Sequence, residues 1–228
     1  RRQILCDGYP DTPELKSQSN RRANDPKSNN GVYPFESSRP FLWRTGAALA
    51  DFNGDGLVDL VTHDGNHRVA TLFTQYRKQD ATLGLRKDRL LKLADGRSIN
   101  DKIVDRRSHW TESFRAVDWD DDVLQDLIYS VAGAHAGTQD NGSIYLLSNI
   151  GTTTDPVFAK PRTMCCFGDP IRVTNHGPHP WPADFNGDGK PDLVTCVEWS
   201  VYPYYCHAAL MMERRPSYRI ELQEVIPR

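Results

Sequence analysis

Three short acidic segments of this 228-residue chain carry the residues best suited to chemistry. They run from Asp51 to Asp59, from Asp118 to Asp126 and from Asp184 to Asp192, and they start 67 and 66 residues apart. Each places side-chain oxygens at positions 1, 3, 5 and 9, with a backbone carbonyl at position 7. Calcium takes six to eight oxygen ligands at roughly 2.3–2.6 Å. The spacing therefore predicts a calcium site in each segment.

The predicted ligands are all Asp or Asn: Asp51, Asn53, Asp55, Asp59, Asp118, Asp120, Asp122, Asp126, Asp184, Asn186, Asp188 and Asp192. Gly56 and Gly189 at position 6 allow the sharp turn that brings these oxygens onto one ion. The second segment has Val123 there, and a β-branched residue resists positive φ. We therefore expect the second loop to bind calcium more weakly than the other two.

The main alternative for such loops is the EF-hand, which closes with a bidentate Glu at position 12 and is flanked by helices. Position 12 is Thr62, Tyr129 and Thr195 in the three loops, and none of these residues can ligate in that way. The flanking runs, β-branched and aromatic around the second and third loops, are typical of strands. Each loop is therefore predicted to join two strands of a hairpin, in a unit repeated at a near-fixed period.

The loops resemble the FG-GAP, or VCBS-type, repeats of integrin-like β-propellers. The segment 143–151, followed by 156–158, is similar to the third strand and exit of that family. The resemblance covers roughly residues 40–228. It implies an all-β fold with about three four-stranded antiparallel blades, as part of a larger ring, since propellers usually close with four to eight. Residues 1–39 are rich in Asn, Ser, Pro and charge and are predicted as a loop or linker.

The resemblance further implies an extracellular or periplasmic, secreted protein, with the remaining blades supplied from outside this chain. Charged residues make up 25% of the chain and the net charge is −2, so the clustered basic excess of a nucleic-acid binder is not expected. No apolar run approaches the ~20 residues of a membrane span. Only a few apolar residues follow Arg1 and Arg2, so the signal peptide of a secreted protein is expected to lie outside the given sequence.

The five cysteines are odd in number, so at least one is free or bonded outside this chain. We interpret most of them as small buried thiols. Cys196 and Cys206 could instead face each other across neighbouring strands of the third repeat.

Polar residues gather in the connections at the opposite end of the predicted strands from the acidic loops. Six of the seven histidines fall there: His63, His67, His109, His135, His176 and His179. Loops held by a rigid scaffold are where binding and catalysis concentrate. His63 and His67 are themselves predicted to be surface residues. Trp119 follows a loop Asp, at the position of Phe52 and Phe185, and is predicted to lie in the core.

The segment 175–181 holds two histidines three residues apart, His176 and His179. Pro178 and Pro180 argue against a helix, so the pair is predicted to lie on a rigid extended turn. Three interpretations stay open for these imidazoles. They could hydrogen-bond to backbone in a structural turn, bind a transition metal, or act in catalysis or sugar contact.

Two classes of function follow. The first is a calcium-binding propeller that acts as a binding or scaffold module, with a carbohydrate, on a polysaccharide or a glycoprotein, as its ligand. The second is a polysaccharide lyase, because the repeats resemble those of ulvan and rhamnose–glucuronate lyases. A lyase needs a base, an acid and a cation that neutralises the uronate carboxylate. The candidates are His176, His179 or His109 as base, Tyr202 as acid, and Arg115 or Arg44 as cation.

A glycoside hydrolase would instead need two carboxylates about 5–10 Å apart. Glu112 and Glu198 are the candidates for that pair. For either enzyme the centre of the site is predicted at the His176–His179 turn, together with Glu198 and Tyr202. These residues precede the first strand and follow the second strand of one repeat, so the fold is expected to bring them together.

Overall fold

A computed structural model describes residues 45–63, 69–104, 112–132, 142–173, 179–197, 200–204 and 220–225 of the chain. These residues form strands and loops, with one short 3-10 helix, η2 (Asp101–Val104). The all-β prediction is therefore confirmed. Within the described ranges, no helix has the length and hydropathy needed to cross a membrane. The predicted N-terminal linker, 1–39, lies outside them.

The first sheet contains four antiparallel strands in chain order. They are β2 (Ala48–Ala50), β3 (Asp59–His63), β4 (Ala70–Arg77) and β5 (Leu83–Leu90). The first acidic loop joins β2 to β3, so its hairpin forms as the flanking residues predict. This sheet matches one predicted four-stranded unit.

The second sheet is larger, with eight strands. Its path is β1 (Thr45–Gly46), β6 (Glu112–Val117), β7 (Asp126–Val131), β8 (Gly142–Leu147), β9 (Arg162–Cys166) and β10 (Asp169–Pro170). Two further strands, β11 (Arg172–Val173) and β15 (Ile220–Glu224), pair with β8 and β9 respectively. The second predicted unit, β6 to β9, is thus extended by strands from elsewhere in the chain.

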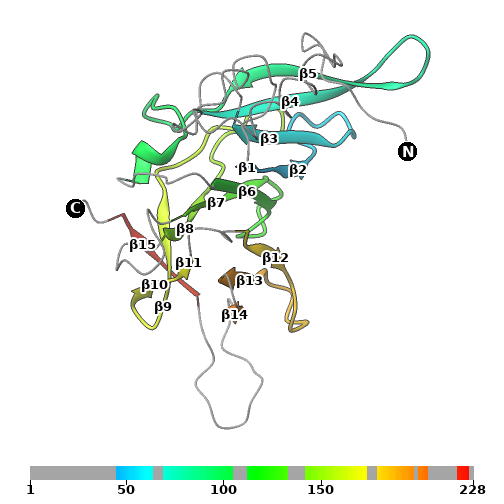
Figure 1. The fold of residues 1–228 in the computed structure, drawn as a ribbon. Coiled ribbons are helices and arrows are strands. Elements are labelled where there is room, and N and C mark those ends of the chain that lie inside the picture. The colour runs from blue at the N-terminus through cyan, green and yellow to red at the C-terminus, as the bar shows by residue number, and fades with distance from the viewer. Residues whose placement is uncertain are drawn as a thin grey trace, which may run out of the picture.

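The third sheet is β12 (Trp181–Ala183), β13 (Asp192–Val197) and β14 (Ser200–Tyr204). The C-terminal strand β15 pairs with β9 rather than extending this sheet. The described strands therefore form several sheets, antiparallel apart from the β1–β6 pair, that do not close into a barrel, and a propeller of separate four-stranded blades stays a prediction. Figure 1 shows the first sheet at the top, the second sheet running from the centre to the lower left, and the third sheet at the lower right.

The three acidic hairpins share one register. Ala50 pairs with Asp59, Val117 with Asp126 and Ala183 with Asp192. Position 9 of each loop is thus the first residue of the second strand, directly opposite the last residue of the first strand. The three hairpins therefore share one local arrangement, and we call the hairpins with the strands that follow them unit one (45–90), unit two (112–166) and unit three (179–204).

Two apolar clusters join successive units. One contains Phe52 and Val61 of unit one together with Leu127 of unit two. The other contains Trp119 of unit two and Leu193 of unit three. Trp119 is buried, which confirms its predicted place in the core. Among the cysteines, Cys165 and Cys166 are buried thiols on β9, whereas Cys206 lies outside the described residues.

The first strands of the three units meet near Gly46. Strand β1 runs parallel to β6, with Gly46 opposite Ser113. A Cβ placed on Gly46 would lie 2.5 Å from the Ser113 Cβ and 3.2 Å from His179 Nδ1. Gly46, Ser113 and His179 each stand five residues before an acidic loop. Equivalent positions of all three units therefore converge, and only glycine fits in unit one.

Candidate metal loops and polar groups at the opposite strand ends

In all three acidic loops the first Asp accepts hydrogen bonds from the loop backbone. Asp51 Oδ1 accepts from Gly54 N at 2.7 Å, and its Oδ2 accepts from Gly56 N at 2.8 Å. Asp184 accepts from Gly187 N at 2.7 Å and from Gly189 N at 3.0 Å. These bonds wrap each loop around its first carboxylate, as a compact cation loop requires.

The second loop forms the same turn without glycine. Asp118 Oδ2 accepts from Val123 N at 2.9 Å, in the place of the position-6 glycine amides. The φ of Val123 is 75°, close to 78° at Gly56 and 81° at Gly189. Val123 therefore adopts the positive φ that its side chain disfavours, which stores strain of about 1–3 kcal/mol.

Carboxylates converge most clearly in the second loop. Ligand oxygens of Asp118, Asp120 and Asp122 lie within 4.8 Å of one another. Hard oxygen donors at this spacing fit a calcium ion. The first and third loops have Asn at position 3, where Asn53 and Asn186 donate to the Asp at position 5 at 3.0 and 3.2 Å.

The Asp at position 9 is buried in each loop and binds backbone amides. Asp59 accepts from Phe52 N at 3.0 Å and from Gln75 N of β4 at 2.9 Å. Asp126 accepts from Trp119 N at 3.1 Å and from Asn149 N at 2.6 Å. Asp59 and Asp126 thereby tie the first and second loops to a neighbouring segment, a structural role beside the ligand role that the spacing predicts.

Burial changes the acidity of these carboxyl groups. Burial raises the pKa of Asp126 to about 6, partly offset by its two backbone hydrogen bonds. Burial also raises the pKa of Asp59, by the same mechanism. In the exposed Asp184, by contrast, hydrogen bonds from the loop amides lower the pKa. Asp184 therefore stays charged and suited to a cation.

Next to Gly46, two residues predicted for catalysis come together. Arg115 Nη1 and His179 Nδ1 lie 3.3 and 3.2 Å from one and the same point, the ideal Cβ position on Gly46. Arg115 Nη1 donates to Phe114 O at 2.8 Å and to Ala47 O at 3.0 Å, which fixes the guanidinium. Arg115 Cζ also lies 5.5 Å from the centre of the Trp181 ring.

The protonation states of this pair follow from their surroundings. Although the His179 side chain is exposed, surrounding protein partly desolvates it, and together with the Arg115 charge this lowers its pKa below 6.5. Burial also lowers the pKa of Arg115, which stays charged near neutral pH. At pH 7 the pair is therefore a neutral imidazole beside a cation.

A buried polar cluster lies near the same end of the strands. His63, Glu112 and Tyr129 are almost fully buried, so the prediction that His63 is a surface residue is wrong. Tyr129 Oη donates to Glu112 Oε2, and His63 Nε2 lies 3.3 Å from the same oxygen. Burial, and next the charge of Glu112, raise the pKa of Tyr129 well above 10.

The reason for the burial of His63 is its place at the end of β3, where its ring packs edge-on against Phe114 of β6, with centroids 5.0 Å apart. Glu112 was a candidate carboxylate for a hydrolase. Its burial keeps it away from a polymer on the surface. No local signal in the sequence identifies this cluster, because its members come from three strands of two sheets.

The other predicted site residues are less informative. His109, His176, Glu198, Arg44 and His67 lie outside the described residues. Tyr202 belongs to β14, where its backbone pairs with Thr195. The predicted centre that joins the His176–His179 turn with Glu198 and Tyr202 therefore stays a prediction.

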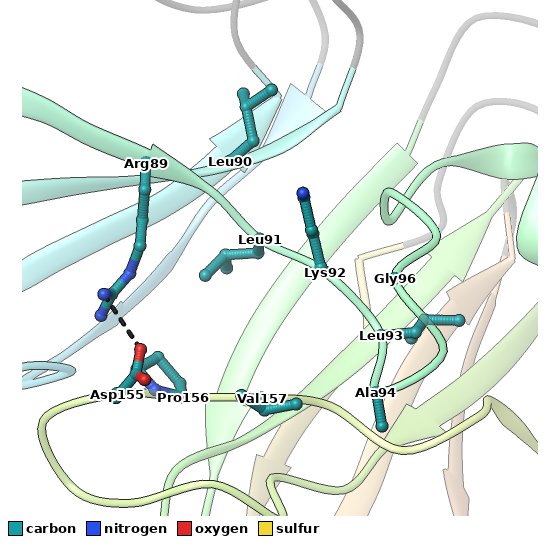
Figure 2. A pocket seen from close by; sticks show the side chains of 10 residues that line it. All are labelled: Arg89, Leu90, Leu91, Lys92, Leu93, Ala94, Gly96, Asp155, Pro156 and Val157. Carbon is teal, nitrogen blue, oxygen red and sulfur yellow. Dashed lines mark ion pairs between the residues drawn. The ribbon is translucent and has the colours of Figure 1, made fainter.

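A cavity of about 300 Å³ lies between the chain segment at the end of β5 and the loop after β8. Its lining residues are Arg89, Leu90, Leu91, Lys92, Leu93, Ala94, Gly96, Asp155, Pro156 and Val157. Figure 2 shows Arg89 reaching across to Asp155, and the two side chains form an ion pair of 3.0 Å. Arg89 also donates to Thr154 O at 3.2 Å. No motif in the sequence predicted this cavity.

In comparisons with known proteins, no family model, no curated protein and no solved structure matches the chain.

Proposed function

We propose that this chain is a calcium-binding β-sheet scaffold that presents a ligand-binding surface at the strand ends opposite its metal loops. The repeated geometry of the acidic loops carries the proposal. Three loops share one register, one pattern of hydrogen bonds from backbone to the first Asp, and positive φ at position 6. Such strict repetition is unneeded for a simple hairpin turn, but it is what three cation sites of one design require.

The proposed arrangement of the units is that of FG-GAP, or VCBS-type, propeller blades. Two observations support it. Equivalent residues of the three units, Gly46, Ser113 and His179, converge at one point. In addition, the position-2 aromatic of one unit packs with a Leu of the next, twice in succession. The proposed location is extracellular or periplasmic, where calcium is abundant enough to fill loops of this kind.

The proposed ligand is a carbohydrate that bears a carboxylate. Its binding surface lies around Gly46, where Arg115 supplies a positive charge and His179 supplies an exposed neutral imidazole. Arg115 is already positioned by two backbone carbonyls, so little side-chain entropy is lost on binding. Calcium in the acidic loops would hold the other ends of the same strands.

The second candidate function is a polysaccharide lyase, favoured by the closeness of Arg115 and His179. In that reaction Arg115 pairs with the uronate carboxylate and so acidifies the C5 proton. His179, neutral at pH 7, takes this proton. The electron pair forms the C4–C5 double bond, the glycosidic oxygen leaves, and an acid such as Tyr202 protonates it.

One assay separates these functions. Calcium-loaded protein is incubated with a glucuronate-containing polysaccharide, and ultraviolet absorbance and reducing ends are followed. New absorbance identifies elimination, and His179→Ala should abolish it. New reducing ends without absorbance identify hydrolysis instead. Binding with neither product supports the scaffold. Arg86→Gln is the control, since Arg86 stacks on Tyr76 in unit one, away from this surface.

A further inference from the structure

The packing between successive units repeats one pattern. The back face of a unit carries the position-2 aromatic and an aliphatic residue of the second strand: Phe52 and Val61 in unit one, and Trp119 and Ile128 in unit two. These four side chains are at most 8% exposed. They lie in the clusters that join each unit to the following one. The following unit therefore covers the back face of the preceding one.

The front face that covers them is also repeated. Leu127 of unit two and Leu193 of unit three occupy the same position, next to the first residue of the second strand, and both are fully buried. Each pairs across the hairpin with a small or cyclic residue, Ala116 or Pro182. Directly opposed residues of neighbouring strands point to the same face. At each interface, an aromatic residue on the back face of one unit thus lies in the same apolar cluster as a Leu on the front face of the next unit.

Unit three leaves its back face open. Phe185, the counterpart of Phe52 and Trp119, is 47% exposed. Val194, the counterpart of Val61 and Ile128, is only partly buried. Trp181, which pairs with Val194 across the hairpin, is 59% exposed, and the guanidinium of Arg115 from unit two lies over part of its ring. Large apolar side chains clustered in this way mark an interaction surface.

Unit one leaves part of its front face open. Leu60, the counterpart of Leu127 and Leu193, is partly exposed. Leu49 pairs with Leu60 across the hairpin and is 65% exposed. Phe73 and Leu85, farther out on this face, are already covered. The accessible part is therefore the inner edge around Leu49 and Leu60.

Units one and three expose the two complementary halves of an interface that forms twice between successive units of the chain. We propose that a second copy of this chain docks head to tail, with Phe185 and Val194 of one copy against Leu49 and Leu60 of the other. Such an interface joins two different surfaces, and it ends in a closed ring if the rotation allows. Two copies with two identical contacts then form the ring. This proposal extends the proposed function but does not depend on calcium or carbohydrate binding.

Sedimentation equilibrium of the whole chain tests this arrangement. The chain has a mass of 25.9 kDa, and we expect a species of twice that mass at micromolar concentration. Phe185→Ser and Leu49→Ser should each yield monomers. Each contact of the ring uses Phe185 from one copy and Leu49 from the other, so either substitution, present in both copies, weakens both contacts. Ile150→Ser is the matched control, since Ile150 is 58% exposed but lies on neither face. Circular dichroism checks that every variant keeps its strands.

Mixing the two variants distinguishes head-to-tail docking from other dimers. A mixed pair restores one intact contact, between Phe185 of the Leu49 variant and Leu49 of the Phe185 variant. Mixing should therefore return part of the dimer. A monomeric wild-type chain would overturn the proposal, as would a dimer that survives Leu49→Ser, because a symmetric contact between two Phe185 faces does not use Leu49.

Discussion

The guanidinium of Arg115 lies over the indole of Trp181, with Cζ 5.5 Å from the ring centre. Both residues stand three positions before an acidic loop, Arg115 in unit two and Trp181 in unit three. Their counterpart in unit one is Ala48, which is 1% exposed. The same position thus holds a buried methyl group in unit one, a cation in unit two and an exposed aromatic ring in unit three. The three hairpins share one backbone geometry, and their side chains at this position differ in chemistry.

Removal of the Arg115 charge should raise the pKa of His179. Burial is the larger cause of the lowered pKa and the Arg115 charge is the second, so Arg115→Gln should move the value upward without fully restoring it. Nuclear magnetic resonance titration of the His179 ring measures this. Arg86→Gln should leave the His179 titration unchanged.

The same shift has a consequence for stability. Because the pKa of His179 is lower in the folded state than in the unfolded state, the folded state binds fewer protons at pH values just below 6.5. Folding stability should therefore rise with pH through that window. In the Arg115→Gln variant this rise should shrink. An unaltered His179 titration in that variant would separate the two residues and remove the support for the lyase.

Relief of strain in the second loop should stabilise the protein. Val123→Gly keeps the positive φ of 75° without the steric cost, and should raise the free energy of unfolding by about 1 kcal/mol. The reverse change at the equivalent position, Gly189→Val, should lower it by about 1–3 kcal/mol. Urea unfolding in the presence of a chelator measures both. Equal stability of all three proteins would contradict the strain.

The position-9 carboxylates should matter for folding even without calcium. Asp126→Ala removes the acceptor for Trp119 N and Asn149 N in a buried site. With a chelator present, we expect a loss of about 2–4 kcal/mol. Asp155→Ala is the control, because its ion pair with Arg89 is exposed and is worth less than about 1 kcal/mol. Similar losses in both variants would argue against the structural role.

The buried Tyr129 hydroxyl should also contribute to stability. Tyr129→Phe leaves the Glu112 carboxylate without this donor and should cost about 2 kcal/mol. A double-mutant cycle with Glu112→Gln isolates the coupling between the two side chains. Additive losses in the cycle would show that the hydroxyl and the carboxylate do not interact.

The sequence predicted the features that depend on local spacing. The hairpins around Asp51, Asp118 and Asp184 form because each needs only nearby residues. The buried position of Trp119 followed from its equivalence to Phe52. The turn at Val123 shows the limit of a local rule, because hydrogen bonds to Asp118 hold a conformation that the residue alone disfavours.

Features that depend on distant contacts were missed. His63 is buried because Phe114 and Tyr129 of another sheet cover it. Strand β15 pairs with β9 across a long stretch of chain, which no turn signal indicates. The need for glycine at position 46 was also missed, because it arises from the close approach of Ser113 and His179, which are distant in the sequence.

Calorimetric titration of the chelator-treated protein with calcium tests the central claim most directly. We predict at least two tight sites, from the first and third loops, and a weaker third. Combined Asp184→Asn and Asp188→Asn changes should remove one tight site, whereas Asp80→Asn, in an exposed turn outside the loops, should remove none. At 100 times the dissociation constant, each site should add about 2.7 kcal/mol to the free energy of unfolding. No binding heat, with an unchanged melting temperature, would contradict the account.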